Sequence, residues 1–337
     1  MSVTAHSLLP DGIETTFPEI ETTMARLASG GASAGSIRRS VTTAATATVV
    51  IIGPKPRLLD VAESLKTGGT LNGVRSIFIA SGALCTPGVR VTASEIALDG
   101  LRDEFVDNAV GALRLPSLPT VLWWRGGDPE RVQALAKLVD RVVLDAEDPE
   151  PLWARIDALI AEGPIGDLRW TALTRWRVLM AHFFEMPAIQ AAAPRFTRLE
   201  IAGGDRHSAR LLGAWLMTSL KLQNLGFKIV DDSRNAIVRL ALVNEAEEIT
   251  LKRLDGSSCV EGRARVNGRE ASRVASIGDQ NLLTLMAEEL RVRTHDPAFE
   301  AAVRSATRLR PERGAGGQRG EAEPPSEERA GVGPREQ

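Results

Sequence analysis

The sequence contains few cysteines and no long hydrophobic run. Cys85 and Cys259 are its only cysteines, and their spacing matches no zinc motif, CxxC motif or disulfide framework. We therefore expect two reduced structural thiols, with a redox pair as the alternative. The longest apolar run, from Thr43 to Ile52, is about half as long as the roughly twenty residues that cross a membrane as a helix. We expect no membrane association.

Neither sign of charge is in large excess. The chain has 337 residues, and 41 Lys and Arg oppose 43 Asp and Glu, for a net charge of -2. This balance argues against a general binder of nucleic acid. The first residues, Met1 to Phe17, include Asp11 and Glu14 but no basic segment followed by an apolar core, so no secretory signal is visible. We therefore predict a cytoplasmic protein.

Aromatic residues are scarce but concentrated. They make up 4% of the chain, tyrosine is absent, and all six tryptophans lie between Trp123 and Trp215. Hydrophobic residues reach 43% and charged residues 25%, as in ordinary globular proteins. Because indoles supply large and rigid contact area, we expect important packing or binding in the middle of the chain.

The order of predicted elements indicates two folded regions. Strands alternate with helices of about ten residues between residues 41 and 165, which predicts an α/β domain with a mostly parallel sheet. Short strands joined by turns such as Asn267-Gly268 predict an α+β domain with an antiparallel sheet over residues 191–307. The remaining segments are a flexible N-terminal arm (1–40), a linking amphipathic helix (166–190) and a disordered tail (308–337).

Two glycine-containing motifs resemble catalytic or cofactor motifs. Gly31 to Gly35 matches GxSxG, but a helix-like run precedes it where a nucleophile elbow needs a strand, so we interpret it as a flexible loop. Arg125 to Pro129 lies between a strand and a helix, where phosphates bind in Rossmann proteins. The GxGxxG spacing is absent, and we interpret Asp128 as a helix cap. The four histidines show no metal-ligand spacing. We therefore expect no catalytic set, cofactor or metal.

The remaining candidates are tryptophans and arginines. Trp170 and Trp176 recur at helical spacing on one apolar stripe, bordered by Arg169 and Arg177. This stripe either packs the two domains together or contacts a partner, since Trp and Arg are frequent at binding hot spots. Trp123 and Trp124 point to opposite faces of their strand, and Arg125 follows at its carboxyl end. The candidate partner-binding residues are Trp123, Trp124, Arg125, Arg169, Trp170, Trp176 and Arg177.

Three ordered segments carry a family resemblance. Residues 118–126 read LPTVLWWRG, residues 140–145 read DRVVLD, and residues 167–171 read DLRWT before Trp176-Arg177. In this order they resemble the glucose-6-phosphate dehydrogenase assembly protein family, roughly over residues 40 to 300. The resemblance implies a non-catalytic partner of glucose-6-phosphate dehydrogenase in the oxidative pentose phosphate pathway, which supplies NADPH. Such a partner favours the active oligomer of the dehydrogenase or acts as its allosteric activator. The alternative is an enzyme that binds a sugar phosphate or nucleotide near Arg125 or the loop of Lys55 and Arg57.

Overall fold

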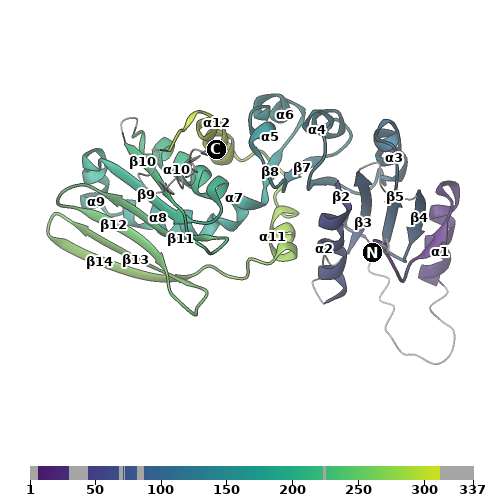
Figure 1. Ribbon diagram of the computed structural model, residues 1–337, viewed down its shortest axis with the longest axis horizontal. Coiled ribbons are helices and arrows are strands. Elements are labelled where there is room, and N and C mark those ends of the chain that lie inside the picture. Colours follow the sequence, from purple (N-terminus) through teal and green to yellow (C-terminus); the bar gives the residue numbers. More distant parts are fainter. Residues whose placement is uncertain are drawn as a thin grey trace, which may run out of the picture.

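The computed structural model describes residues 7–29, 45–67, 71, 73–81, 87–222 and 225–311. Within these ranges the strands form two sheets (Figure 1). Sheet A has eight strands in the order β1-β4-β5-β3-β2-β6-β7-β8, and sheet B has six in the order β10-β9-β11-β12-β13-β14. The expected fold class is confirmed: a mostly parallel sheet is followed by a mostly antiparallel one. Gly31 to Gly35 and Cys85 lie outside the described residues.

Sheet A is parallel from β5 through to β8 and antiparallel from β1 to β5. Its central strands read as nearly continuous apolar runs because helices cover both faces. The strands are β1 (Ile13–Thr15), β2 (Ala47–Pro54), β3 (Val74–Ser81), β4 (Gly88–Val91), β5 (Glu95–Asp99), β6 (Thr120–Trp124), β7 (Arg141–Leu144) and β8 (Ile165–Asp167).

Short helices follow these strands. They are η1 (Phe17–Glu19), α1 (Ile20–Ser29), α2 (Lys55–Lys66), η3 (Asp103–Phe105), α3 (Val106–Leu113), α4 (Pro129–Ala136), α5 (Glu150–Trp153) and α6 (Ile156–Glu162). The Asp128 carboxylate accepts a hydrogen bond from the Glu130 N–H at the start of α4. The interpretation of Asp128 as a helix cap is therefore confirmed. Among the described residues no helix is both long and apolar enough to span a bilayer.

Two expectations for the first part of the chain are wrong. In the flexible arm expected over residues 1–40, residues 13–15 form β1, which pairs with β4, while the short helix expected at Glu21 to Ala28 forms as α1 and packs on the core through Ile20 and Met24. The alternation of Val89, Val91 and Ala93 with polar residues predicts one half-exposed strand over Val89 to Leu98, but this segment forms the antiparallel pair β4 and β5. Its turn is fixed by the Thr92 hydroxyl, which accepts the N–H of Glu95, a local bond that competes with continued strand.

The linking helix expected over residues 166–190 is interrupted. Residues 165–167 still belong to sheet A as β8, and the helical part divides into α7 (Leu168–Ala172), α8 (Thr174–Phe184) and α9 (Pro187–Ala192). The break lies at Leu173, whose N–H donates a hydrogen bond to the carbonyls of both Arg169 and Trp170. This tight turn redirects the chain.

Sheet B and its helices follow. The elements are η4 (Ala193–Arg195), β9 (Arg198–Gly203), α10 (Arg206–Leu220), β10 (Gly226–Val230), β11 (Ile237–Val243), β12 (Glu248–Arg253), β13 (Cys259–Val266), β14 (Arg269–Ser276), α11 (Leu282–Glu289) and α12 (Pro297–Arg308). Asn267 and Gly268 both have positive φ, 52° and 71°, as a type I′ hairpin turn requires. The expected β13–β14 hairpin is therefore confirmed.

Helix α11 returns from sheet B to sheet A. It lies beside α2 (Figure 1), where Leu283 and Met286 pack in one cluster with Leu58 and Val61. We expected this helix to belong with the antiparallel sheet in the region 191–307. Its helical spacing marks an apolar face correctly, but spacing does not reveal which sheet that face covers. The two halves of the chain therefore interlock.

Helix α8 approaches sheet B at a glycine. A Cβ atom added to Gly262 on β13 would lie 2.6 Å from the ring of Phe183, which is fully buried. Any side chain at this position would have to displace the ring and the helix that carries it. This close contact allows α8 to pack against the inner face of sheet B.

We therefore expect Gly262→Ala to lower the free energy of unfolding by about 1–3 kcal/mol, the usual cost of overpacking a core. Gly111→Ala is the control: this glycine lies within α3 and an added Cβ would meet nothing within 4 Å. Alanine there should raise stability by up to about 1 kcal/mol. Urea unfolding of both variants tests the pair, and equal stability of wild type and Gly262→Ala would contradict the packing argument.

Candidate functional site

The tryptophans of β6 lie on opposite faces of sheet A, as predicted. Trp123 packs in the cluster that contains α2 and α11, and Trp124 packs in the cluster that extends to sheet B. Both side chains are buried, with 0% and 2% of their surface exposed. Both indoles thus lie in the protein interior, and their part in partner binding stays a prediction.

Arg125 is held inside the carboxyl edge of sheet A. Its Nε donates to Asp145 Oδ2 at 2.8 Å, and its Nη1 donates to the carbonyl of Arg57. Trp123 Nε1 donates to the same Asp145 oxygen at 3.3 Å. Burial lowers the pKa of Arg125, and the charge of Asp145 opposes that shift. The guanidinium that could have anchored a phosphate is thus engaged within the protein.

Trp170 and Arg177 meet at the junction of the two sheets. The Arg177 guanidinium carbon lies 3.5 Å from the centre of the Trp170 ring, an arrangement in which the cation faces the negative π-surface. Trp170 Nε1 donates to Asp296 Oδ2 at 2.8 Å, and its ring packs against Phe299. Burial lowers the pKa of Arg177 to about 10, although Asp296 and Glu289 act in the opposite direction.

A buried ion pair lies beside this contact and was not among the predicted residues. Arg141 on β7 donates to Glu289 on α11 at 2.6 Å, with only 4% and 5% of the two side chains exposed. Thr171 on α7 also donates to Glu289. The sequence contains a signal for one member only: Glu289 continues the three-residue spacing of Leu283 and Met286 on the apolar face of α11, whereas nothing indicates Arg141, which lies 148 residues away.

Asp167 is a fully buried carboxylate at the end of β8. It accepts the Trp153 indole N–H at 3.2 Å and the Arg169 backbone N–H at 2.9 Å, and thereby caps α7. Desolvation raises its pKa to about 6, against the lowering effect of Arg169. Burial therefore destabilises the ionised form of the Asp167 carboxylate.

The predicted residues therefore gather mainly in the protein interior. Trp170 and Trp176 are 4% and 3% exposed, and Arg169 and Arg177 are partly buried. The sequence left two interpretations of the Trp and Arg stripe, domain packing and partner contact. Its position at the junction of the two sheets agrees with domain packing. A direct part in partner binding stays a prediction for these residues. In the described part of the chain, His, Cys, Asp and Glu side chains form no group of three that could hold a metal.

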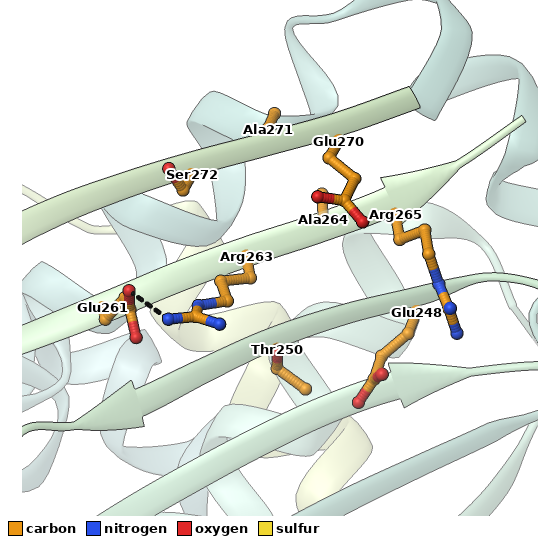
Figure 2. Close-up of a pocket in the computed structure, with 9 residues that line it drawn as sticks. All are labelled: Glu248, Thr250, Glu261, Arg263, Ala264, Arg265, Glu270, Ala271 and Ser272. Carbon is orange, nitrogen blue, oxygen red and sulfur yellow. Dashed lines mark hydrogen bonds and ion pairs between the residues drawn. The ribbon is translucent and has the colours of Figure 1, made fainter. Parts of the chain in front are cut away.

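Sheet B presents a second candidate, its outer face. Alternation along β13 buries Val260, Gly262 and Ala264 and leaves Arg263 and Arg265 exposed on the other face. Figure 2 shows these arginines among the acidic side chains of β12, β13 and β14. They line a shallow hollow of about 470 Å³ formed by Glu248, Thr250, Glu261, Arg263, Ala264, Arg265, Glu270, Ala271 and Ser272.

Acidic and basic side chains alternate on this outer face and form ion pairs. Arg263 pairs with Glu261 at 2.9 Å, and Arg239 on β11 lies between Glu200 at 3.7 Å and Glu248 at 3.6 Å. The helices that contact β13 and β14, chiefly α8, pack on the inner side where the apolar residues lie. Cys259, a free thiol, occupies β13 at one end of the strand; its proposed structural role stays a prediction.

Comparison with known families identifies the C-terminal part. Residues 163–303, which contain α7, α8, the whole of sheet B and α11, match the family described as the C-terminal domain of the glucose-6-phosphate dehydrogenase subunit. The resemblance to the glucose-6-phosphate dehydrogenase assembly protein family is confirmed. Two curated relatives of this family carry the name OxPP cycle protein OpcA.

The relative from Nostoc punctiforme is 24% identical over 238 residues, which cover 66% of this chain and 50% of that protein. The relative from a Synechocystis species is 27% identical over 138 residues, which cover 37% of this chain and 29% of that protein. The chain thus matches half or less of the length of each of these OpcA proteins.

Solved structures resemble the chain only distantly. An aldose-aldose oxidoreductase from Caulobacter crescentus aligns with a TM-score of 0.44 and 9% identity, covering 78% of this chain and 95% of that one. UDP-N-acetylglucosamine 3-dehydrogenase GnnA from Acidithiobacillus ferrooxidans aligns with a TM-score of 0.41 and 10% identity, covering 78% and 96%. These likenesses are too weak to assign an activity.

The raised pKa of Asp167 gives a pH-dependent stability. Its proton is held more tightly in the folded than in the unfolded chain, so the free energy of unfolding should fall as pH rises from about 4 to about 6. The full loss is about 3 kcal/mol, since one pKa unit corresponds to about 1.4 kcal/mol. Asp167→Asn removes this titration and keeps one capping oxygen. Denaturant unfolding at several pH values should show the stability of wild type relative to the variant falling by about 3 kcal/mol between pH 4 and pH 7, and a constant difference over this range would refute the assignment.

Proposed function

We propose that this protein is a non-catalytic partner of glucose-6-phosphate dehydrogenase and binds it through the outer face of sheet B. The observation that carries the proposal is the position of this face. It lies wholly within residues 163–303, the part that matches the dehydrogenase subunit family, and its centre is a broad strand surface with exposed arginines.

The chemistry of the face suits a protein partner. Arginine is enriched at protein interfaces, and alternating charges fix the register of two surfaces while speeding their encounter. Arg263 and Arg265 are exposed, whereas Glu261, which pairs with Arg263, and Glu248, which lies opposite Arg265 on β12, are half-buried. A complementary surface can replace these intramolecular ion pairs with intermolecular ones.

Binding alone would activate the dehydrogenase if it discriminates between conformations. A partner that binds the active oligomer or the high-affinity state more tightly than the inactive one shifts the population toward it. A difference of about 1–3 kcal/mol changes the apparent affinity for substrate by roughly 5- to 150-fold. No chemistry within this chain is needed for that effect.

The alternative, an enzyme that binds a sugar phosphate or nucleotide on sheet A, has less support. Its cationic anchors are already occupied: Arg125 by Asp145 and the Arg57 carbonyl, and Lys55 by Asp99 at 3.1 Å. Strand β2 passes directly into α2 with Pro54 at its end and Pro56 in the first turn of the helix, and proline lacks the backbone N–H that a phosphate-binding helix start offers.

The proposal predicts a measurable activation. Added at saturation, the purified chain should lower the apparent KM of its cognate dehydrogenase for glucose 6-phosphate or shift that enzyme's oligomer distribution. Arg263→Glu combined with Arg265→Glu should weaken the effect about tenfold or more, because like charges then face each other. Steady-state kinetics and analytical ultracentrifugation provide the two measurements.

Lys137→Glu is the matched control. Its side chain is exposed at the end of α4, far along the chain from sheet B, so charge reversal there should leave activation unchanged. An unaltered rate and mass profile of the dehydrogenase at saturating wild-type chain would refute the proposed function. Equal activation by the double variant would refute the assigned surface alone.

A further inference from the structure

Strand β14 forms a long open edge of sheet B. It is the last strand of that sheet and, within the described residues, pairs only with β13 (Figure 1). It has eight residues, whereas β10 at the opposite edge has five and the edge strands of sheet A, β1 and β8, have three each. Proteins usually protect an edge with a short strand, a proline or a bulge. β14 contains no proline, and its register with β13 is unbroken.

The ladder between β13 and β14 determines which backbone groups point away from the sheet. The Ile277 N–H donates to the Ser258 carbonyl at 2.8 Å, at the end of the β13–β14 register. Because bonded and unbonded pairs alternate along an antiparallel ladder, the residues of β14 that bond to β13 are Arg269, Ala271, Arg273 and Ala275. The residues whose N–H and C=O groups point away from β13 are Glu270, Ser272 and Val274. These groups are available to a further strand.

The side chains of β14 include two arginines without a counter-charge. Arg269 and Arg273 are exposed on the inner side of the strand, the side that α8 contacts, and neither forms an ion pair with a described residue. Glu270 lies on the outer side and faces Arg265 on β13. On the same outer side Val274 is 61% exposed, more than any other large apolar side chain of the described residues. The edge therefore offers two positive charges and one apolar contact.

A second copy of this chain does not supply the missing negative charge. If two copies of β14 paired about a two-fold axis, residues on the inner side of one strand would face residues on the inner side of the other. Arg269 and Arg273 would then face only arginine or alanine of the other β14, because Glu270 lies on the outer side. Like charges opposite each other are destabilising. The two arginines thus oppose self-pairing and favour a strand with acidic side chains.

We propose that glucose-6-phosphate dehydrogenase adds an antiparallel strand to the edge of β14; this inference rests on the proposed function and specifies how the two proteins meet. The added strand bonds to the outward backbone groups of β14, as in other complexes formed by strand addition. It presents two acidic side chains, four residues apart, to Arg269 and Arg273. Both arginines then occupy unbonded pairs with the new strand, where side chains of neighbouring strands lie closest. On its other side an apolar residue covers Val274, next to the outer face of sheet B.

Hydrogen exchange resolved to single amides tests the added strand directly, by comparing the full chain alone with its complex with the cognate dehydrogenase. The amides of Glu270, Ser272 and Val274 should exchange at least about tenfold more slowly in the complex, because each becomes hydrogen-bonded. The amides of β10, at the opposite edge of sheet B, should exchange equally in both samples. A complex in which the β14 amides exchange as in the free chain refutes this inference alone. Absence of any complex refutes the proposed function as well.

A pair of substitutions at Ser272 separates the backbone from the side chain. Ser272→Pro removes an outward N–H and leaves the ladder to β13 intact, since proline is tolerated on an edge strand. Ser272→Ala removes the hydroxyl and keeps the N–H. Calorimetric titration with the dehydrogenase should give a dissociation constant about tenfold or more higher for Ser272→Pro than for Ser272→Ala, through the lost hydrogen bond. Equal binding by the two folded variants overturns the inference, and the exchange experiment decides if Ser272→Pro does not fold.

Charge reversal tests the acidic character of the added strand. Arg269→Glu combined with Arg273→Glu should weaken binding about tenfold or more, because like charges then face each other. Lysine at both positions keeps the charges and should retain most of the affinity, and Lys137→Glu, distant along the chain on α4, should bind as wild type does. Unchanged binding by the double glutamate variant overturns the assignment of acidic side chains to the partner strand.

Discussion

Buried indole N–H groups must find acceptors, and in this protein each of three finds an aspartate that also has a second partner. Trp123 donates to Asp145, which holds Arg125; Trp153 donates to Asp167, which caps α7; Trp170 donates to Asp296, which caps α12. The tryptophans thus fix the positions of the carboxylates, and two of these carboxylates, Asp167 and Asp296, fix the starts of helices. The junction between the two sheets depends on this arrangement.

The same arrangement explains why a neutral protein concentrates Trp and Arg in the middle of its sequence. Once three carboxylates are committed to indoles and helix caps inside the protein, arginines must accompany them to compensate the buried charge. Arg125 and Arg169 act in this way toward Asp145 and Asp167. A pattern that resembles a binding hot spot can therefore arise from the requirements of a buried polar junction, while the exposed arginines of β13 lie elsewhere.

The sequence predicts local structure well in this protein. Asp128 with Pro129 marks the start of α4, Asn267 with Gly268 marks the hairpin, and the opposite faces of Trp123 and Trp124 follow from strand periodicity, because each depends only on neighbouring residues. The pairing of β1 with β4, the covering of α2 by α11 and the Arg141–Glu289 ion pair escape prediction. They depend on contacts between residues far apart in the chain, which periodicity does not encode.

The same limit applies to the candidate site. The resemblance locates the family and its distinctive strings, yet residues of those strings, such as Trp170 and Trp176, lie in the interior. The outer face of β12 to β14 is composed of common residues in simple alternation and offers no distinctive motif. It becomes visible only when the sheet is assembled and one of its faces is left without helices in the described structure.

Because α11 packs on sheet A, the region that matches the family is not the same as the region that packs as one core. The matched region, residues 163–303, includes this helix, but Leu283 and Met286 complete a core whose other half, Leu58 and Val61, lies outside that region. A fragment that contained only residues 163–303 would expose the apolar face of α11, because α2 and sheet A, which cover that face, would be missing. Any relative that retains this domain must retain, or replace, a companion to cover it.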